Sequence, residues 1–448
     1  MTVAFVTLGC KVNQVDSDTL RQRLEAAGCT CVSPESTPDV LVINSCAVTA
    51  ESERKTRQKL RHYRALYRDC VLVLTGCAAQ AGKANDYPEA DLVMGHRDIG
   101  ALSHEIITLS CAKASAEHPV SSGEALDASP DESANRTRAQ CARTRAQCAR
   151  TRAHIKIEDG CDRFCAYCVI PHARGPVRSM PLDAIKREIA ALDAQGFREV
   201  VLVGINLAAY GTDLGCGLCD ALALFSDNEL LSSIKRVRLG SLEPDLLTPQ
   251  LISTLEKFSF CAGIEICPHF HISLQSGCGS TLKRMGRHYS AEEYFSLIKR
   301  LRALFPGAAV TTDIMVGFPG ESDDEFEASL NFARAAGFAK MHVFPYSSRP
   351  GTAAAAMPGQ IPRAVKRARA KKMLALAAEC QADFLYSQIG RVLEVLPEEA
   401  HPAGGMRGYS AEYAPVRITD AGPEAQNQIV PARIVSASAD HCVGALSQ

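Results

Sequence analysis

The 448-residue sequence has no long apolar run and no excess of charge of either sign. No stretch approaches the ~20 consecutive apolar residues that a membrane-spanning helix needs, so a transmembrane protein is not expected. The 49 Lys and Arg residues nearly balance the 50 Asp and Glu residues. Any contact with a nucleic acid must therefore come from local basic patches. At this length we expect two or three domains.

The first residues, MTVAFVTLGC, lack the features of a secretory signal: a charged start, a long apolar core and a small-residue cleavage site. They are typical of a buried strand that ends in glycine. We therefore expect a cytoplasmic protein. In that reducing compartment, clustered cysteines more often bind metals or take part in catalysis than form disulfides. The 19 cysteines of the chain are accordingly candidates for metal ligands.

Three cysteines, but no fourth, stand close together in GCDRFCAYCVIP, residues 160–171, with the spacing C-x₃-C-x₂-C. A structural zinc site usually closes all four positions, and a disulfide framework needs an even count. Three thiolates on one tight loop suit a 4Fe-4S cluster in which one iron stays open to a further ligand. The predicted cluster ligands are Cys161, Cys165 and Cys168.

Residues 1–111 alternate strand-like and helix-like segments, which predicts a doubly wound domain with a parallel sheet. A cysteine follows three of its predicted strands: Cys10, Cys46 and Cys77. Ligands of such sheets gather beyond the carboxyl ends of the strands. These three cysteines could therefore meet and hold a second cluster, although each could also be a small buried hydrophobic residue.

Residues 112–153 are expected to form a linker. Their second half is a tandem repeat, RTRAQCA RTRAQCA RTRA, over residues 136–153. Two copies are too few for a solenoid, and the repeat is typical of an in-frame duplication that extends a basic linker. An arginine arm that contacts phosphates is the alternative. CGLC, residues 216–219, could bind a metal, but two incidental thiols are the simpler interpretation.

Residues 154–378 resume the alternation of strands and helices, which suggests a full or partial (β/α) barrel with its working face at the carboxyl ends of the strands. Residues 379–448 contain short strands divided by Pro and Gly turns, which is typical of a small β-barrel. On or beside one of these strands lie Tyr409, Tyr413 and Arg417, residue types that stack on RNA bases and clamp phosphates.

GCDRFCAYCVIP followed by ARGPVRS resembles the cysteine loop of radical S-adenosylmethionine enzymes. TLGCKVNQ, NSCAVT and TGCAAQ resemble the three N-terminal cysteine motifs of the methylthiotransferases. RLGSLEP, HISLQSG, RMGRHY, DIMVGFPGE and FPYSSRPGT resemble the barrel motifs of that family. The likeness covers nearly the whole chain. TLGCKVNQ and the GYSAEYAPV block look most like the branch that acts on N6-threonylcarbamoyladenosine in tRNA. The duplicated RTRAQCA departs from the family, in which a single RTRA is expected.

The resemblance implies an α/β fold: a doubly wound N-terminal domain, a radical-SAM partial (β/α) barrel and a small C-terminal all-β barrel of the TRAM type. It also implies two 4Fe-4S clusters, each on three cysteines, and S-adenosylmethionine. The residues expected at the cofactor are Tyr167, Gly204, Asn206, Ser241, Glu243, Gln275 and Asp313. Those expected at the RNA are Arg174, Arg178, Tyr409, Tyr413 and Arg417.

The implied reaction is methylthiolation of carbon 2 of the modified adenine next to the anticodon. That hydrogen is not acidic, so a cofactor must carry the difficult step. The implied partners are the anticodon stem-loop of a tRNA and an electron donor of the flavodoxin or ferredoxin type, with the sulfur donor left open.

Four other interpretations stay open. The substrate could be isopentenyladenosine in tRNA or an aspartate of a ribosomal protein. In a different class, the chain could be an RNA-binding protein stabilised by zinc. An electron-transfer protein with two ferredoxin-like clusters fits less well, because it predicts four cysteines per cluster and no barrel.

Overall fold

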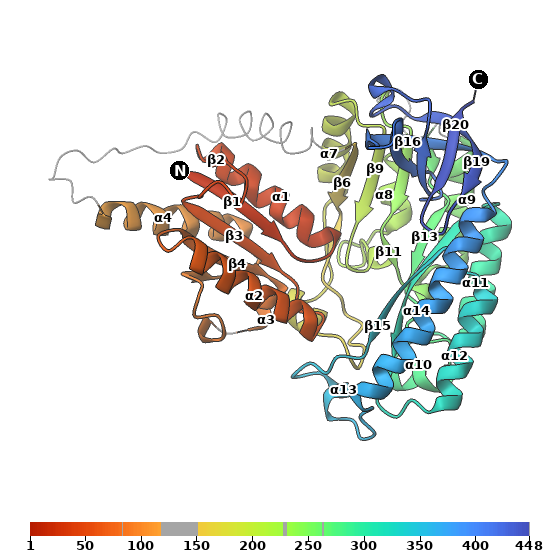
Figure 1. Cartoon of the computed structure of the whole chain (residues 1–448), viewed down its shortest axis with the longest axis horizontal. Coiled ribbons are helices and arrows are strands. Elements are labelled where there is room, and N and C mark those ends of the chain that lie inside the picture. Colours follow the sequence, from red (N-terminus) through yellow and green to blue (C-terminus); the bar gives the residue numbers. More distant parts are fainter. Residues whose placement is uncertain (83, 118–150, 227–230, 262–263, 448) are drawn as a thin grey trace. The chain divides into compact units, whose positions relative to one another are not determined.

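The computed structural model describes residues 1–82, 84–117, 151–226, 231–261 and 264–447 (Figure 1). The chain divides into two compact units. The N-terminal unit comprises Met1–Ala149 and Cys168–Gly175, and the barrel unit comprises Arg150–Tyr167 and Pro176–Gln448. The duplicated RTRAQCA falls outside the described residues. Among the described helices, none combines the length and the apolar character that crossing a bilayer would require.

The N-terminal unit contains a five-stranded parallel sheet in the order β2-β1-β3-β4-β5 (Figure 1). Its strands are β1 (Thr2–Thr7), β2 (Thr30–Cys31), β3 (Val40–Ser45), β4 (Val71–Gly76) and β5 (Leu92–Val93). The helical segments are α1 (Lys11–Ala26), α2 (Ala50–Leu66), α3 (Cys77–Ala81), η1 (Ala84–Asp86), α4 (Ile99–Glu117) and α6 (Ile170–Arg174). Helix α4 thus runs six residues beyond the boundary predicted at residue 111.

Helices cover both faces of this sheet. Leu20 of α1 and Ile106 of α4 pack on one face, against alternate strand residues such as Val42. Leu60 of α2 packs on the other face, against the intervening residues such as Ile43. Since successive strand side chains point to opposite faces, the continuous apolar runs of β3 and β4 are buried on both sides. The predicted doubly wound arrangement is confirmed.

The barrel unit contains parallel strands in two four-stranded sheets, β12-β10-β9-β6 and β11-β13-β14-β15. Only Gly240 separates β10 from β11, so the two sheets continue into each other as an open barrel. The bounds are β6 (Arg152–Lys156), β9 (Glu199–Val203), β10 (Arg236–Leu239), β11 (Ser241–Leu242), β12 (Glu265–Ile266), β13 (His269–Ile272), β14 (Ala309–Val316) and β15 (Lys340–Pro345). A short antiparallel pair, β7 (Glu158–Asp159) and β8 (Arg178–Ser179), lies beside it.

The outward side chains of the barrel sheet lie in one large core. Helices surround this sheet (Figure 1). They are α7 (Leu182–Ala194), α8 (Leu218–Ala223), α9 (Pro249–Cys261), α10 (Gly279–Met285), α11 (Ala291–Leu304), α12 (Asp323–Ala336), α13 (Ala353–Ala356) and α14 (Arg363–Tyr386), with short helices η2 (Leu207–Ala209) and η3 (Pro244–Leu246). Reciprocal capping boxes start α11 at Ser290 and α12 at Ser322. Helix α14 crosses the predicted boundary at residue 378.

The C-terminal strands form a closed barrel in the order β16-β17-β18-β20-β19. Their bounds are β16 (Val392–Ala400), β17 (Met406–Ser410), β18 (Pro415–Ile418), β19 (Val430–Ala437) and β20 (Cys442–Leu446), with η4 (Pro423–Ala425) between β18 and β19. Closure removes the exposed strand edges, and Val395, Val416 and Ile434 fill the interior. The predicted small all-β barrel is confirmed.

A buried charge network joins the C-terminal barrel to the parallel sheet. Arg236 and Arg238 both donate to the Glu199 carboxylate at 2.7 Å, and all three side chains are at most 1% exposed. Arg238 also donates to the carbonyl oxygens of Ser410 and Ala411, at 3.1 and 2.8 Å. The inward-facing positions of β9 and β10 therefore fix the C-terminal barrel in place.

Candidate iron–sulfur and cofactor sites

Three cysteines stand at the same edge of the N-terminal sheet. Cys10 precedes α1 and follows β1, Cys46 follows β3, and Cys77 begins α3 directly after β4. Because β1, β3 and β4 are adjacent parallel strands, their carboxyl ends meet at one edge. Cys10 is exposed, Cys46 is partly buried and Cys77 is buried. The structure thus brings together the three cysteines that the sequence separates by up to 67 residues, from residue 10 to residue 77.

Two asparagines hold the cysteine loops together. The Asn13 side chain donates to Asn44 Oδ1 at 2.8 Å and to the Ser45 carbonyl at 3.1 Å, and Cys10 Sγ donates to Asn13 Oδ1 at 3.3 Å. Asn44 Nδ2 donates in return to the Asn13 carbonyl at 2.9 Å. Sequence reasoning did not single out these asparagines, although both lie inside quoted motifs, TLGCKVNQ and NSC.

Gly76, directly before Cys77, is required by the same packing. Its φ of +90° is unfavourable for residues with a side chain. A Cβ atom there would also lie 2.3 Å from Asn44 Oδ1 and 2.4 Å from the Ser45 carbonyl oxygen. Glycine therefore lets the ends of β3 and β4 approach closely enough for their cysteines to share one site.

The electrostatics show that the three thiols and Arg174 share one environment. Burial raises the pKa of the Cys77 thiol to about 12, the Arg174 guanidinium opposes this rise, and Cys46 and Cys10 add to it. Burial likewise raises the pKa of Cys46. Without a metal, the neutral thiols of Cys46 and Cys77 are thus favoured, and a bound metal ion would displace their protons.

Arg174 does not lie where the sequence analysis placed it. An RNA contact was expected, but the side chain is fully buried in the N-terminal unit. Its Nη2 donates to Asp16 Oδ2 at 3.1 Å and to Asn13 Oδ1 at 3.3 Å. A buried, ion-paired guanidinium cannot reach a phosphate, so this prediction is wrong for the structure described. Arg174 instead supports the loop that carries Cys10.

The boundary between the compact units passes through the second cysteine loop, between Tyr167 and Cys168. On the barrel side, Arg287 Nη1 donates to Cys165 Sγ at 3.3 Å, and Arg287 Nη2 lies 2.5 Å from Glu243 Oε1. Burial raises the pKa of Cys161 to about 11, and the neighbouring Cys165 and Glu243 raise it further. Cys161 and Cys165 therefore share an environment, which Arg287 of the RMGRHY motif lines.

Tyr167 packs edge-on against Phe318, with ring centroids 6.4 Å apart. The backbone of Ala166, just before it, is held at both ends: its N–H donates to the Met285 carbonyl at 2.9 Å, and its carbonyl accepts from Ala354 at 2.7 Å. Tyr167 thus contributes to packing within the loop. A contact with the cofactor stays a prediction.

The polar residues predicted at the cofactor lie mostly at the carboxyl ends of neighbouring barrel strands. Gly204 and Asn206 follow β9, Ser241 and Glu243 belong to or follow β11, and Gln275 follows β13. Glu158 Oε2 accepts from the Asn206 N–H at 2.7 Å and would lie 2.6 Å from a Cβ atom on Gly204. The loop after β9 therefore needs glycine to lie against Glu158.

Two buried acceptors at this end of the barrel are suited to a ligand. Asn206 Oδ1 and Gln275 Oε1 are buried and have no hydrogen-bond partner within the described part of the chain. Gln275 has a left-handed φ of +67°, which its backbone hydrogen bonds to the Asp313 carbonyl and the Met315 N–H hold in place, both at 2.8 Å. Buried acceptors left without donors are costly. Amino and hydroxyl groups of a bound cofactor would supply those donors.

Asp313 differs from the prediction, which placed it just after a strand. It lies inside β14, which continues to Val316. Its carboxylate points to the inner face of the barrel, where Oδ2 lies 3.4 Å from His271 Nε2. The sequence analysis ended this strand before Asp313, but three more residues of DIMVGFPGE, Ile314 to Val316, still belong to the strand.

Comparison with known proteins identifies the family of the chain. Residues 155–333 match the model of the radical SAM superfamily, and residues 2–95 match the uncharacterized protein family UPF0004. The threonylcarbamoyladenosine tRNA methylthiotransferase MtaB of Thermotoga maritima is 34% identical, over 92% of this chain and 90% of that protein. MtaB of Bacillus subtilis is 36% identical, over 89% and 85% of the two chains. The chain belongs to the radical S-adenosylmethionine tRNA methylthiotransferase family.

Another branch of the family is nearly as similar. The tRNA-2-methylthio-N(6)-dimethylallyladenosine synthase of Pelotomaculum thermopropionicum is 32% identical, over 99% of this chain and 97% of that protein. Among solved structures, the radical S-adenosylmethionine methyltransferase TsrM of Kitasatospora setae has a TM-score of 0.52 and 14% identity, covering 79% of this chain and 77% of that chain. That likeness supports the fold alone.

As a radical SAM methylthiotransferase, the enzyme uses S-adenosylmethionine and a 4Fe-4S cluster. The described residues fit both groups. Cys161 and Cys165 offer soft thiolate ligands on one loop, and the buried acceptors on Asn206 and Gln275 lie just after strands β9 and β13 of the barrel. Arg287, which is paired with Glu243, donates to Cys165 of this loop from the barrel side.

The residues predicted at the RNA differ in exposure and in what they contact. Arg178 is exposed, with its Nη2 3.6 Å from Asp159 Oδ2. Tyr409 and Tyr413 stack on each other with centroids 4.7 Å apart, and Tyr413 also stacks on His269 of β13 at 4.7 Å. The two tyrosines thus join the C-terminal barrel to the parallel sheet of the methylthiotransferase, and RNA contact by them stays a prediction.

Arg417 lines a groove of about 420 Å³ on the C-terminal barrel. The groove is also lined by Arg152, His401, Arg407, Tyr409 and His441, with Glu398, Glu399 and Asp440 among its acidic groups. Arg417 donates to the carbonyls of Ala403 and Gly404 at 2.6 and 3.1 Å. This placement leaves Arg417 as the best situated of the predicted RNA-binding residues of this barrel.

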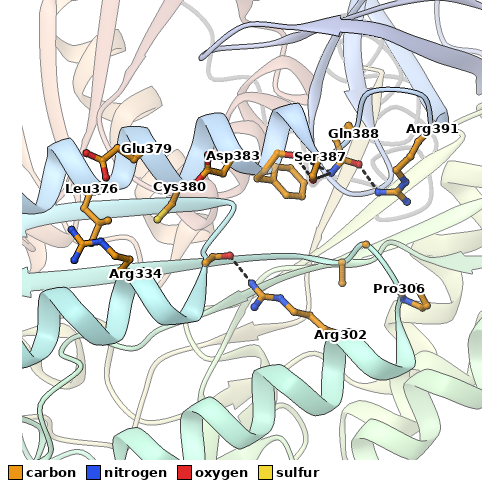
Figure 2. Close-up of a pocket in the computed structure, with 14 residues that line it drawn as sticks. Arg302, Pro306, Arg334, Leu376, Glu379, Cys380, Asp383, Ser387, Gln388 and Arg391 are labelled. Atoms are coloured by element: carbon orange, nitrogen blue, oxygen red, sulfur yellow. Dashed lines mark hydrogen bonds between the residues drawn. The ribbon is translucent and has the colours of Figure 1, made fainter.

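Figure 2 shows a larger pocket, of about 690 Å³, whose lining includes none of the predicted cofactor residues. It is formed where α11 and α12 end and where α14 approaches its own end, at the amino-terminal side of β14. Arg302 crosses it to donate to the carbonyls of Ala336 and Gly337, both at 2.6 Å. This arginine stabilises the end of α12, and the pocket is not part of the cysteine sites.

Proposed function

We propose that the chain methylthiolates carbon 2 of N6-threonylcarbamoyladenosine next to the anticodon of tRNA. The observation that carries this proposal is the meeting of Cys10, Cys46 and Cys77 at one edge of the N-terminal sheet. A radical SAM enzyme needs one cluster for its cofactor, and this second cysteine trio supplies ligands for another. Its function would be to hold the sulfur that enters the product, since iron binds sulfide readily.

The two groups of cysteines have separate tasks in this proposal. Cys161, Cys165 and Cys168 would hold the cluster that, with S-adenosylmethionine bound, supplies the one-electron chemistry needed at an unactivated aromatic C–H bond. Arg287 places a positive charge beside Cys165. The buried acceptors on Asn206 and Gln275 would orient the bound cofactor. An electron donor of the flavodoxin or ferredoxin type would serve as reductant.

The inner face of the barrel supports the threonylcarbamoyl substrate over the isopentenyl one. His271, Thr311, Asp313 and His342 occupy inward positions of β13, β14 and β15, where their neighbours Phe270 and Ile314 point outward into the core. A polar lining suits a substituent that carries carboxylate, hydroxyl and amide groups. An isopentenyl group would gain little there, because apolar groups are favoured by apolar surroundings.

Nucleoside analysis tests the substrate. The chain would be expressed in a bacterial strain that lacks its own tRNA methylthiotransferases but makes both precursor nucleosides, and total tRNA would be analysed by mass spectrometry. We expect 2-methylthio-N6-threonylcarbamoyladenosine and no methylthiolated isopentenyladenosine. The Cys46→Ala variant serves as a control that keeps the fold but lacks the second trio.

Each other outcome points to a different function. Methylthiolated isopentenyladenosine alone would move the assignment to the other tRNA branch. Unchanged tRNA, together with a mass increase on a ribosomal protein, would indicate the aspartate-modifying branch. Protein that contains zinc and no acid-labile sulfide after anaerobic purification would contradict the enzyme assignment.

A further inference from the structure

Three potential metal ligands lie side by side on the inner face of the barrel. His271, Asp313 and His342 belong to the neighbouring strands β13, β14 and β15, and the strand register places Asp313 opposite His342. One ligand atom from each side chain lies within 4.8 Å of the other two. The imidazole rings of His271 and His342 have centroids 5.8 Å apart. Because all three residues are on paired strands, their backbones are held rigidly.

We propose that His271, Asp313 and His342 bind a divalent transition-metal ion, separate from the iron–sulfur clusters. Two imidazoles and one carboxylate are ligands that Zn²⁺ and Fe²⁺ accept, whereas Mg²⁺ and Ca²⁺ prefer oxygen ligands. Around a tetrahedral zinc ion the ligand atoms lie about 3.4 Å apart. Side-chain rotation can bring the three groups to that spacing without moving the strands.

A further side chain is placed to orient one ligand. Thr311, two residues before Asp313 on β14, has its hydroxyl 3.0 Å from His271 Nδ1 and 3.2 Å from His269 Nε2. If Thr311 donates to His269, its oxygen accepts from His271 Nδ1–H and leaves the Nε2 lone pair facing the metal position. Metal-binding histidines commonly use their second nitrogen in this way.

Two of the three ligand side chains are open to solvent. The His342 side chain is exposed and that of Asp313 is 29% exposed, so an ion and a water ligand have access.

Without a metal, the same residues have a simpler arrangement. His271 Nε2–H would then donate to Asp313 Oδ2, which is 3.4 Å away, and Thr311 would donate to His271 Nδ1. The two arrangements differ in which ring nitrogen of His271 carries the proton and in the presence of the ion. Metal binding therefore separates them directly, and this test does not depend on which nucleoside the enzyme modifies.

The experiment uses the full-length enzyme without an affinity tag, with its clusters reconstituted anaerobically, dialysed against buffered Zn²⁺. We expect about one zinc ion per chain by elemental analysis, and nitrogen and oxygen ligands without sulfur in the zinc X-ray absorption spectrum. His342→Ala and Asp313→Asn should lower zinc affinity about tenfold or more, with iron and sulfide content unchanged. Thr311→Val should lower it about tenfold through His271.

His104→Ala is the matched control, since His104 is an exposed histidine on α4 of the other unit. That variant should bind zinc as the wild type does. The proposal is overturned by any of three results. The dialysed protein could contain no bound zinc, its zinc could have only sulfur ligands, or the wild type, His342→Ala and Asp313→Asn could bind zinc equally.

Discussion

Arg174 and Asp16 form an ion pair of 3.1 Å in which the two side chains are 0% and 2% exposed. The pair joins α6, which follows the second cysteine loop, to α1, which follows Cys10. The same guanidinium also binds Asn13, which contacts Cys10 and the loop before Cys46. Arg174 thus connects α6, which follows the second cysteine loop, to the side chains that pack around Cys10 and Cys46.

Removal of this arginine should destabilise the N-terminal unit. Arg174→Ala leaves the Asp16 carboxylate buried without its partner, a change that typically costs about 3–5 kcal/mol. Anaerobic denaturant unfolding would measure the loss. Arg178→Ala, on an exposed arginine of the next strand, should change stability by less than about 1 kcal/mol. Equal stability of both variants would show that Arg174 is not structural.

Single cysteine substitutions should remove iron from one site at a time. Cys46→Ala should lower bound iron to about half, because the second cluster loses a ligand while the radical-SAM loop keeps its own. Cys165→Ala should lower iron by a similar amount. The double variant should retain almost none. Iron and sulfide analysis of anaerobically reconstituted protein gives the numbers, and full iron content in Cys46→Ala would count against the second cluster.

The Glu199 carboxylate should be essential for attaching the C-terminal barrel. Although burial opposes ionisation, Arg238 and Arg236 hold the pKa of Glu199 far below its ordinary value. Glu199→Gln leaves two buried guanidinium groups without their shared anion, so we expect a loss of about 3–5 kcal/mol. Glu399→Gln is the control, because its ion pair with Arg407 is more than half exposed. Hydrogen exchange should localise the loss to β16–β18.

The stability contributed by Glu265 should fall as the pH rises from acid towards neutrality. Burial and the nearby Glu394 raise the pKa of Glu265 to about 7, above its value of about 4.3 in the unfolded chain. The folded state therefore holds this proton more tightly, and its contribution is fully present below about pH 4 and lost above about pH 7. We expect the melting temperature of wild type to decline from about pH 5 to about pH 7, and that of Glu265→Gln to decline less. Matching profiles would refute this.

RNA binding should depend on the groove of the C-terminal barrel. Arg417→Ala should weaken binding of an anticodon stem-loop and reduce the slope of log affinity against log salt by about 1, because one phosphate contact is lost. Unfolding should be almost unchanged. Arg433→Ala, an exposed arginine on β19 outside the groove, should bind as the wild type does. Titration at several salt concentrations distinguishes the two.

Local sequence patterns were sufficient for the fold of each part. The apolar runs VLVINS and VLVLTG predict buried parallel strands, and the structure has them as β3 and β4. The short strands after residue 390 predict a small barrel, which closes as expected. The domain boundaries did not follow from local patterns: helices α4 and α14 continue through the limits predicted at residues 111 and 378. Where a helix ends depends on what its last turn packs against.

Side-chain environments could not be predicted in the same way. The sequence analysis treated Arg174 as a surface group, whereas the fold buries it against Asp16. It expected Tyr413 at the RNA, which stays a prediction, and did not foresee that the ring stacks on His269. It did not single out Asn13 and Asn44, whose bonds to each other depend on two strand ends far apart in the chain.

The ligand types and their local spacing can be read from the sequence: three thiols within eight residues on one loop, and one thiol after each of three predicted strands. These features depend only on neighbours along the chain. Folding was needed for β1, β3 and β4 to bring their cysteines to one edge, and for His271, Asp313 and His342 to share a face. Such contacts follow from strand order and register, which hydrophobic burial of the whole chain sets.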